Sequence, residues 1–341
     1  MKAISLFSIL LFALVHASLS AQTGSALAAA APVPPSLDAA RTLAEKGHLD
    51  EALKELAQLP SATPGAERLR GMILYQKEDF SLALEAFTHA EALDPNDREA
   101  TEMHGLTLFR RGLPAEALPF LEKAHANVPL ANLDPHYVLG LCYIDLKRFN
   151  EARQAFASYY NFSPDSAEAH LLLARLLLRR GRAPESAAEV ARAIELNPRL
   201  PGAHLLLGEA ELAIDDQPAA LAAFEAELKI DPLNGAVYDR IGDACLRAGN
   251  NERAQMELNR AILLEPNTTA PYILLAQTLL NLKQPTLALH YLNRALRMDP
   301  SNYITHNLLA QAYKATGQLA EANREFKTVA QLRARLAQEE R

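Results

Sequence analysis

Four histidines are the residues whose type and spacing first suggest chemistry. His136, His170, His204 and His306 are separated by multiples of 34 residues, and imidazole nitrogens are common zinc ligands. However, stacked helices place equivalent side chains about 10 Å apart, whereas each ligand of one zinc ion lies about 2 Å from it. We therefore interpret the four histidines as helix-packing residues and predict no bound metal.

Other reactive residue types are sparse or isolated. The sequence contains no HExxH, GxSxG, CxxC, P-loop or GxGxxG pattern, and these are the motifs that commonly mark a catalytic or nucleotide site. Cys142 and Cys245 lie on helices about three structural units apart, which is too far for a disulfide. We predict that both are buried thiols, and that the chain has no catalytic residues and no cofactor.

The elements that position these residues repeat every 34 residues. Five prolines share this spacing: Pro164, Pro198, Pro232, Pro266 and Pro300. Proline removes a helical N–H and biases the preceding residue away from helix, so each one is predicted to mark a boundary between units. The register extends back through Pro129, after one inserted residue near Asn132, to Pro95.

Side-chain size follows the same register. The eighth position of each unit is small: Gly71, Gly105, Gly140, Ala174, Gly208, Gly242, Ala276 and Ala310. The twenty-fourth position is large and apolar: Phe87, Leu121, Phe156, Val190, Phe224, Leu258, Leu292 and Phe326. Small residues are typical where two helices cross, and large residues fill the space beside the crossing. Each unit is therefore predicted to be a pair of short helices, such as 236–247 and 252–264, that is stable only beside its neighbours.

This pattern resembles the tetratricopeptide repeat, a 34-residue helix–turn–helix unit. The resemblance implies an all-α, right-handed superhelical solenoid over residues 33–336, with the first helix of each unit lining a concave groove. About nine units are expected, near 33–63, 64–97, 98–132, 133–166, 167–200, 201–234, 235–268, 269–302 and 303–336. Residues 337–341 are expected to end a C-terminal capping helix, whose charged face keeps the open end soluble.

The sequence departs from the family pattern at two kinds of position. The usual Trp or Tyr at the fourth position is replaced by the four histidines. The usual Ala at the twenty-seventh position becomes Tyr159 and Glu227. We expect a bend between the third and fourth units, where Tyr159 coincides with the inserted residue. Glu227 is expected near the interface with the next helix, where a buried carboxylate needs a partner.

The resemblance also assigns a candidate binding groove to defined positions of each unit. Its candidate partner-binding residues are Tyr137, Val138, Leu141, Leu171, Leu172, Arg175, Arg179, Leu205, Leu206, Glu209, Asp239, Arg240, Asp243 and Arg247. Ile144, Leu178, Leu212 and Leu246 complete the lining. The sixth position has no Asn, which disfavours the chaperone-type carboxylate clamp and the asparagine ladder of sugar-transferase relatives.

Apolar and charged groove residues suggest different roles. The leucines suit an amphipathic helix or an extended apolar peptide. Arg175 with Arg179, and Asp239 with Asp243, are like-charge i,i+4 pairs, which slightly destabilise a helix. Either these pairs bind opposite charges on a ligand, or neighbouring units neutralise them, and the sequence leaves both interpretations open.

The N-terminus has the pattern of a secretory signal peptide. Lys2 precedes an apolar run, residues 4–15, and a small-residue stretch, residues 17–21. The run is shorter than the roughly 17–25 residues of a membrane span. We therefore predict a signal peptide at residues 1–21, an Ala/Pro-rich linker at 22–35, and no stable membrane span after cleavage. The alternative is a membrane anchor formed by the uncleaved segment.

Composition narrows the choice of partner. The formal net charge of −7 and pI of about 5.8 disfavour nucleic-acid binding, which relies on positive charge. Almost no sequence remains outside the repeats to form a catalytic domain. We therefore predict a non-catalytic, exported scaffold or adaptor, periplasmic or extracellular, that binds a protein or peptide in its groove. The alternative is a self-associating structural subunit of an envelope or secretion assembly.

Overall fold

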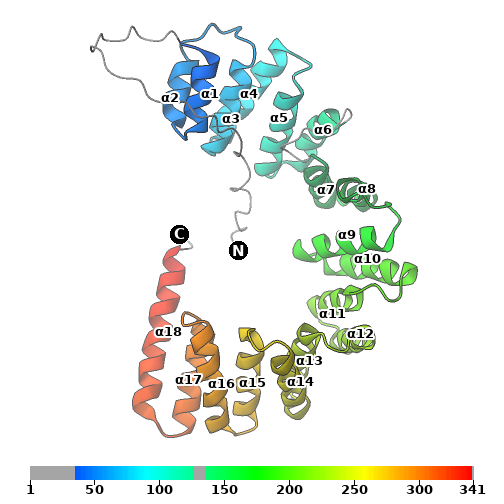
Figure 1. Ribbon diagram of the computed structural model, residues 1–341, viewed down its shortest axis with the longest axis vertical. Helices are drawn as coiled ribbons and strands as arrows, with labels where there is room; N and C mark the ends of the chain where they lie inside the picture. Colours follow the sequence, from blue (N-terminus) through cyan, green and yellow to red (C-terminus); the bar gives the residue numbers. More distant parts are fainter. Residues whose placement is uncertain (1–34, 126–134, 340–341) are drawn as a thin grey trace, which may run out of the picture. The chain divides into compact units, whose positions relative to one another are not determined.

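The computed structural model describes residues 35–125 and 135–339. The chain divides into two compact units, which we call the N-terminal unit, ending at Asp165, and the C-terminal unit, beginning at Ser166. In the described residues all regular secondary structure is helical, with eighteen α-helices and no strand (Figure 1). The predicted all-α repeat fold is confirmed. The predicted signal peptide and residues 22–34 of the predicted linker lie outside the described residues.

The N-terminal unit contains four helix pairs. Their helices are α1 (Leu37–Glu45), α2 (Leu49–Leu56), α3 (Ala66–Gln76), α4 (Phe80–Leu93), α5 (Arg98–Arg110), α6 (Pro114–His125), α7 (Pro135–Asp145) and α8 (Phe149–Tyr160). Each helix packs against the one before it, and α1, α3, α5 and α7 also pack against one another in order. Residues near Asn132, where we expect the stack to bend, lie outside the described residues.

The C-terminal unit contains five helix pairs. Their helices are α9 (Ala167–Arg179), α10 (Ala183–Leu196), α11 (Ala203–Ala213), α12 (Gln217–Ile230), α13 (Gly235–Arg247), α14 (Asn251–Leu264), α15 (Thr269–Asn281), α16 (Pro285–Met298), α17 (Tyr303–Ala315) and α18 (Leu319–Glu339). The first helices α9 and α11 pack against each other, as do α13, α15 and α17 in order.

Short polar side chains and prolines set where these helices begin and end. Ser166, Asn234 and Asn302 accept hydrogen bonds from backbone N–H groups in the first turns of α9, α13 and α17, which satisfies donors that have no intrahelical partner. The five prolines at the 34-residue spacing all lie between the second helix of one pair and the first helix of the next. The prolines therefore separate the pairs, as the spacing predicts.

The small and large positions meet at the helix crossings. A Cβ atom on Gly208 would lie 2.3 Å from Phe224 Cε1, and one on Gly242 would lie 2.5 Å from Leu258 Cγ. Phe224 and Leu258 are fully buried. The predicted register of the eighth and twenty-fourth positions is therefore confirmed at these crossings.

The last pair departs from this pattern. Phe326 occupies the twenty-fourth position, where the sequence predicts a buried side chain, but it is 42% exposed. The prediction was wrong for this residue, because among the described residues no other helix pair covers this face of α18. Leu319 and Leu336, also on α18, are exposed as well.

Candidate functional site: the hollow between α9 and α11

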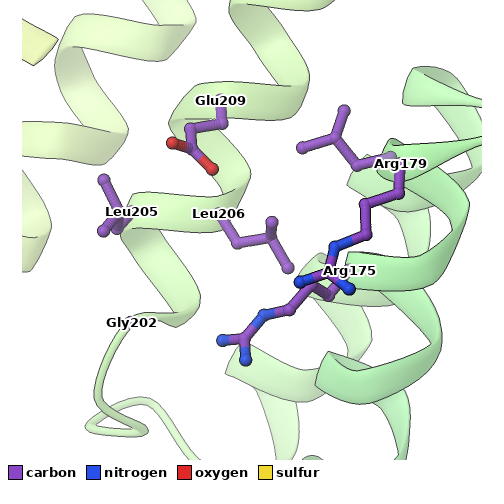
Figure 2. Close-up of a pocket in the computed structure, with 7 residues that line it drawn as sticks. Arg175, Arg179, Gly202, Leu205, Leu206 and Glu209 are labelled. Atoms are coloured by element: carbon purple, nitrogen blue, oxygen red, sulfur yellow. The ribbon is translucent and has the colours of Figure 1, made fainter. Parts of the chain in front are cut away.

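Predicted groove residues from two adjacent repeats line one hollow in the C-terminal unit. Its volume is about 310 Å³, and its lining residues are Arg175, Leu178, Arg179, Gly202, Leu205, Leu206 and Glu209. Figure 2 shows both arginines reaching from α9 toward α11, with Leu206 beside them. All the lining residues except Gly202 were assigned to the groove from the sequence. Gly202 is the second residue of its unit, and the second position is one of those that line the groove in this repeat. Its position in the repeat could therefore have predicted it.

The hollow results from two helix faces held side by side. Arg175 and Arg179 are four residues apart on α9 and therefore share one face. On α11, Leu205 and Leu206 lie four and three residues before Glu209, so each of them neighbours Glu209 on the helix surface. Leu206 is 5% exposed and belongs to the hydrophobic core as well as to the wall, whereas Leu205 is half-buried. The hollow thus combines a rigid apolar wall with two long cationic side chains.

The N-terminus of α11 is held by Glu227. This carboxylate is 1% exposed. Its Oε1 accepts a hydrogen bond from the N–H of Gly202 at 2.7 Å, and its Oε2 accepts one from Leu205 at 3.2 Å. The N-cap residue Gly202 has no side chain to do this. We expected Glu227 at the interface with the next helix, α13. The partners that the structure shows for it are backbone donors of α11 in its own pair, Gly202 and Leu205, and both of these residues line the hollow.

The charges around the hollow are not balanced. Arg240 on α13 donates to Glu209 Oε1 through Nε at 3.0 Å, so the carboxylate in the hollow already has a cationic partner. Arg175 and Arg179 are exposed, and neither forms a hydrogen bond or ion pair with any residue that the structure describes. The sequence left open whether neighbouring units neutralise the charged groove pairs. For Arg175 and Arg179, no described residue does so, which leaves the interpretation that they bind opposite charges on a ligand.

Three of the four charged groove residues on α13, which are Asp239, Arg240, Asp243 and Arg247, have close ion-pair partners. Arg247 pairs with Asp243 in the same helix at 2.8 Å, and Arg240 bridges to Glu209. Asp239 is the exception. It is 9% exposed, its Oδ2 lies 3.9 Å from Arg240, and its Oδ1 is buried without a hydrogen-bond partner in the structure. Burial raises the pKa of Asp239 to about 6, against the lowering effect of Arg240.

The remaining predicted groove residues lie elsewhere. Leu171 and Leu172 are half-buried on α9 and do not line the hollow. Tyr137, Val138 and Leu141 lie on α7 in the N-terminal unit, where the Tyr137 ring packs against Phe156 and Tyr159 at centroid distances of 5.6 and 5.9 Å. Within the C-terminal unit, the structure therefore brings Arg175, Leu178 and Arg179 of α9 together with Leu205, Leu206 and Glu209 of α11.

Two of the four histidines pack between helices as predicted, and each also contacts a carboxylate of the second helix of its pair. His170 and His306 are buried, and their Nδ1 atoms lie 2.6 and 2.5 Å from carboxylate oxygens of Glu189 and Glu325. His306 Nε2 also donates to the carbonyl of Pro300 at 3.0 Å. His204 is half-buried. Across the described residues, no group of three or more His, Cys, Asp or Glu side chains could hold a metal ion.

Two further features lie away from the hollow. A second hollow of about 280 Å³ in the N-terminal unit is lined by Glu91, Pro95, Pro119, Phe120 and Lys123, none of which was predicted. Cys142 and Cys245 are buried thiols, as predicted. None of the described helices combines the length and the apolar character that crossing a membrane would require.

The chain is similar to few curated proteins and to many solved structures. It is 31% identical over 106 residues to human (Homo sapiens) "Tetratricopeptide repeat protein 13", a match that covers 30% of this chain and only 12% of that protein. The matched part is thus a small fraction of the relative's length.

Three solved structures illustrate the likeness in fold. A MamA structure from Desulfovibrio magneticus RS-1 is 20% identical and covers 50% of this chain and 96% of its own, with a TM-score of 0.47. YrrB, described as a TPR protein with an unusual peptide-binding site, is 18% identical and covers 54% and 93%, with a TM-score of 0.45. The Cut9–Hcn1 complex is 16% identical and covers 84% and 57%, with a TM-score of 0.48.

Family models match along most of the described chain. One model of the tetratricopeptide repeat matches residues 37–97, 68–135, 159–201 and 171–235, which together make up more than half of the chain. Two further models of this repeat match residues 108–176 with 279–335, and residues 236–268. The chain belongs to the tetratricopeptide repeat family.

Proposed function

We propose that this protein is a non-catalytic adaptor that binds a protein or peptide partner through the hollow between α9 and α11. The tetratricopeptide repeat fold is typical of protein–protein interaction. The observation that carries the proposal is the hollow itself, in which exposed cationic side chains lie beside half-buried leucines. Binding sites commonly combine an apolar lining with a few polar groups that fix orientation.

The half-buried leucines of the wall supply the affinity. Leu178 and Leu205 retain exposed apolar surface, and burying such surface is worth roughly 25 cal/mol per Å². Leu206 can bury little additional surface on binding, because only 5% of it is exposed in the unbound protein. Leu178 and Leu205 are therefore the residues to change in a binding test, since replacing Leu206 would also damage the core.

A capture experiment with the variant Leu178→Ser/Leu205→Ser tests this proposal. We expect the full chain to retain partners from an envelope extract, and the double variant to lose them while its helical circular dichroism is unchanged. The matched control is Leu196→Ser/Leu263→Ser, which alters two exposed leucines on the second helices α10 and α14 and should retain the partners. Capture of the same partners by Leu178→Ser/Leu205→Ser would contradict a role for this hollow.

We also propose that the protein is exported, with residues 1–21 removed, and is periplasmic or extracellular. The charged, apolar and small-residue regions of the N-terminus support this proposal. N-terminal sequencing of the protein from an envelope or secreted fraction tests it. A mature chain beginning near residue 22 is expected, whereas an intact N-terminus in a membrane fraction would favour the uncleaved anchor.

A second candidate function is self-association through the C-terminal pair. It is favoured by the exposure of Phe326, Leu319 and Leu336 on α18, at 42%, 61% and 44%, because an open-ended repeat array permits contacts that build larger assemblies. Light scattering of the parent chain and of Phe326→Gln separates the two candidates. If the parent chain is monomeric, self-association is excluded and the adaptor function is the candidate that remains.

A further inference from the structure

We infer that the hollow between α9 and α11 selects an acidic partner segment, in which the carboxylate of an Asp or Glu side chain lies between Arg175 and Arg179. This inference rests on the proposed function and adds the chemistry of the ligand. The two guanidinium groups are exposed and lack partners among the described residues. They are four residues apart on one helix, where like charges repel slightly. An anion bound between them would remove this repulsion.

The surroundings favour an anion supplied from outside. Glu209, the carboxylate in the lining, is held by Arg240 of α13 at 3.0 Å. Glu227 occupies the backbone donors of Gly202 and Leu205, so it neutralises the N-terminus of α11 without reaching the arginines. The chain as a whole has a formal net charge of −7, whereas this hollow contains two cations without partners among the described residues. Charge complementarity therefore points to a carboxylate.

The rest of the lining specifies what accompanies the carboxylate. Leu178 and Leu205 are half-buried at the wall, and the aliphatic stems of arginine side chains also present apolar surface. The volume of about 310 Å³ lies at the low end of the range for small-molecule sites, about 300–1,000 Å³. It suits one or two side chains of an extended segment, so we expect an apolar residue directly beside the acidic one.

Guanidinium groups favour the carboxylate geometry in particular. An Arg fork donates two parallel hydrogen bonds to a carboxylate, and charge-assisted bonds of this kind are among the strongest in proteins. A glutamine in the ligand would offer one acceptor and two donors that the arginines cannot use. The preference for Glu over Gln should therefore be large and should fall as salt screens the charges.

Selection from a random twelve-residue peptide library displayed on phage tests this inference with the full chain as bait. We expect the parent protein to enrich peptides with an acidic residue next to an apolar one. The variant Arg175→Gln/Arg179→Gln should lose this acidic preference. The matched control Arg192→Gln/Arg297→Gln removes the same charge from the second helices α10 and α16 and should keep the preference.

A titration of one enriched peptide makes the result quantitative. Replacing its acidic residue by Gln should weaken binding to the parent chain at least about tenfold, the effect of losing a charge-assisted hydrogen bond. The same replacement should change binding to Arg175→Gln/Arg179→Gln less than about twofold. Tighter binding of a phosphoserine version than of the Glu version would overturn the carboxylate assignment.

The outcomes separate this inference from the proposed function. Enriched peptides without acidic preference, or equal enrichment by Arg175→Gln/Arg179→Gln, would overturn the inference and leave peptide binding in place. If no peptide is enriched over empty beads, both the inference and peptide binding at this hollow are overturned.

Discussion

Gly208 of α11 lies against the aromatic ring of Phe224 of α12, so closely that a Cβ atom on Gly208 would be 2.3 Å from Phe224 Cε1. The two helices therefore approach to a distance that only glycine permits at this position. The crossing of α9 and α10 combines a larger residue at the eighth position with a smaller one at the twenty-fourth. These residues are Ala174 and Val190, and both are fully buried. At these two crossings, side-chain sizes at the two positions are coupled.

This coupling predicts the effect of Gly208→Ala. The added methyl group overpacks the crossing, and we expect a loss of about 1–3 kcal/mol in the free energy of unfolding, measured by urea denaturation. The double variant Gly208→Ala/Phe224→Val reproduces the pair found at Ala174 and Val190. It should therefore be less destabilised than the sum of the single variants. Additive effects would show that the two side chains do not meet.

Phe224 and Phe326 hold the same repeat position but should differ in their contribution to stability. Phe224 is 0% exposed, whereas Phe326 is 42% exposed. Phe224→Ala should cost about 3–5 kcal/mol, since it leaves a cavity, and Phe326→Ala should cost less than about 1 kcal/mol, as for a surface change. Parallel urea melts of the two variants check this difference. Equal costs would mean that Phe326 is covered in solution, as self-association requires.

Glu227 should stabilise the protein through α11. Glu227→Gln leaves one acceptor oxygen where two backbone N–H groups need one each, so we expect a loss of about 1–3 kcal/mol from the unsatisfied buried donor. The control Glu225→Gln lies on the same helix and disrupts only an exposed pair with Arg253, which is worth about 0–1 kcal/mol. Urea denaturation of both variants is the measurement. A cost no greater for Glu227→Gln than for the control would contradict the capping role.

Much of the fold could be predicted because the repeat signals it many times over. Prolines at the 34-residue spacing, together with the small and large positions, predict where the helix pairs lie and where they cross. Phe326 was mispredicted because the repeat register gives the position of a side chain within its unit, and not whether a neighbouring helix covers it. The wall of the hollow followed from the repeat positions of Leu205 and Leu206.

Charge pairing could be predicted less well, because it depends on side chains that meet across helices. The bond between Arg240 and Glu209 joins residues 31 apart in sequence, and no local rule selects it over the alternatives within α13. The histidine pairs did leave a signal. His170 and His306 have Glu189 and Glu325 nineteen residues later, whereas His204 has Ala223 at that position.

Asp239 should make stability depend on pH in a defined direction. Its folded-state pKa of about 6 lies above the ordinary value of 3.8 because the carboxyl group is buried, with Asp243 and Glu265 adding repulsion. The native state therefore binds a proton more tightly, and the free energy of unfolding falls as pH rises from about 4 through 6. Asp239→Asn removes this titration. We expect the variant to be more stable than the parent at pH 7.5, by at most about 3 kcal/mol.

The gap between Asp239→Asn and the parent should shrink toward zero at pH 4, where the carboxyl group is neutral in the native state. Urea denaturation of both proteins across pH 4–8 measures it, and Asp299→Asn is the control because hydrogen bonds from Ser301 hold the pKa of Asp299 below its ordinary value. That control should lose stability at pH 7.5, the opposite sign. A gap for Asp239→Asn that is constant with pH, or that widens toward pH 4, would contradict a buried, poorly paired carboxylate on α13.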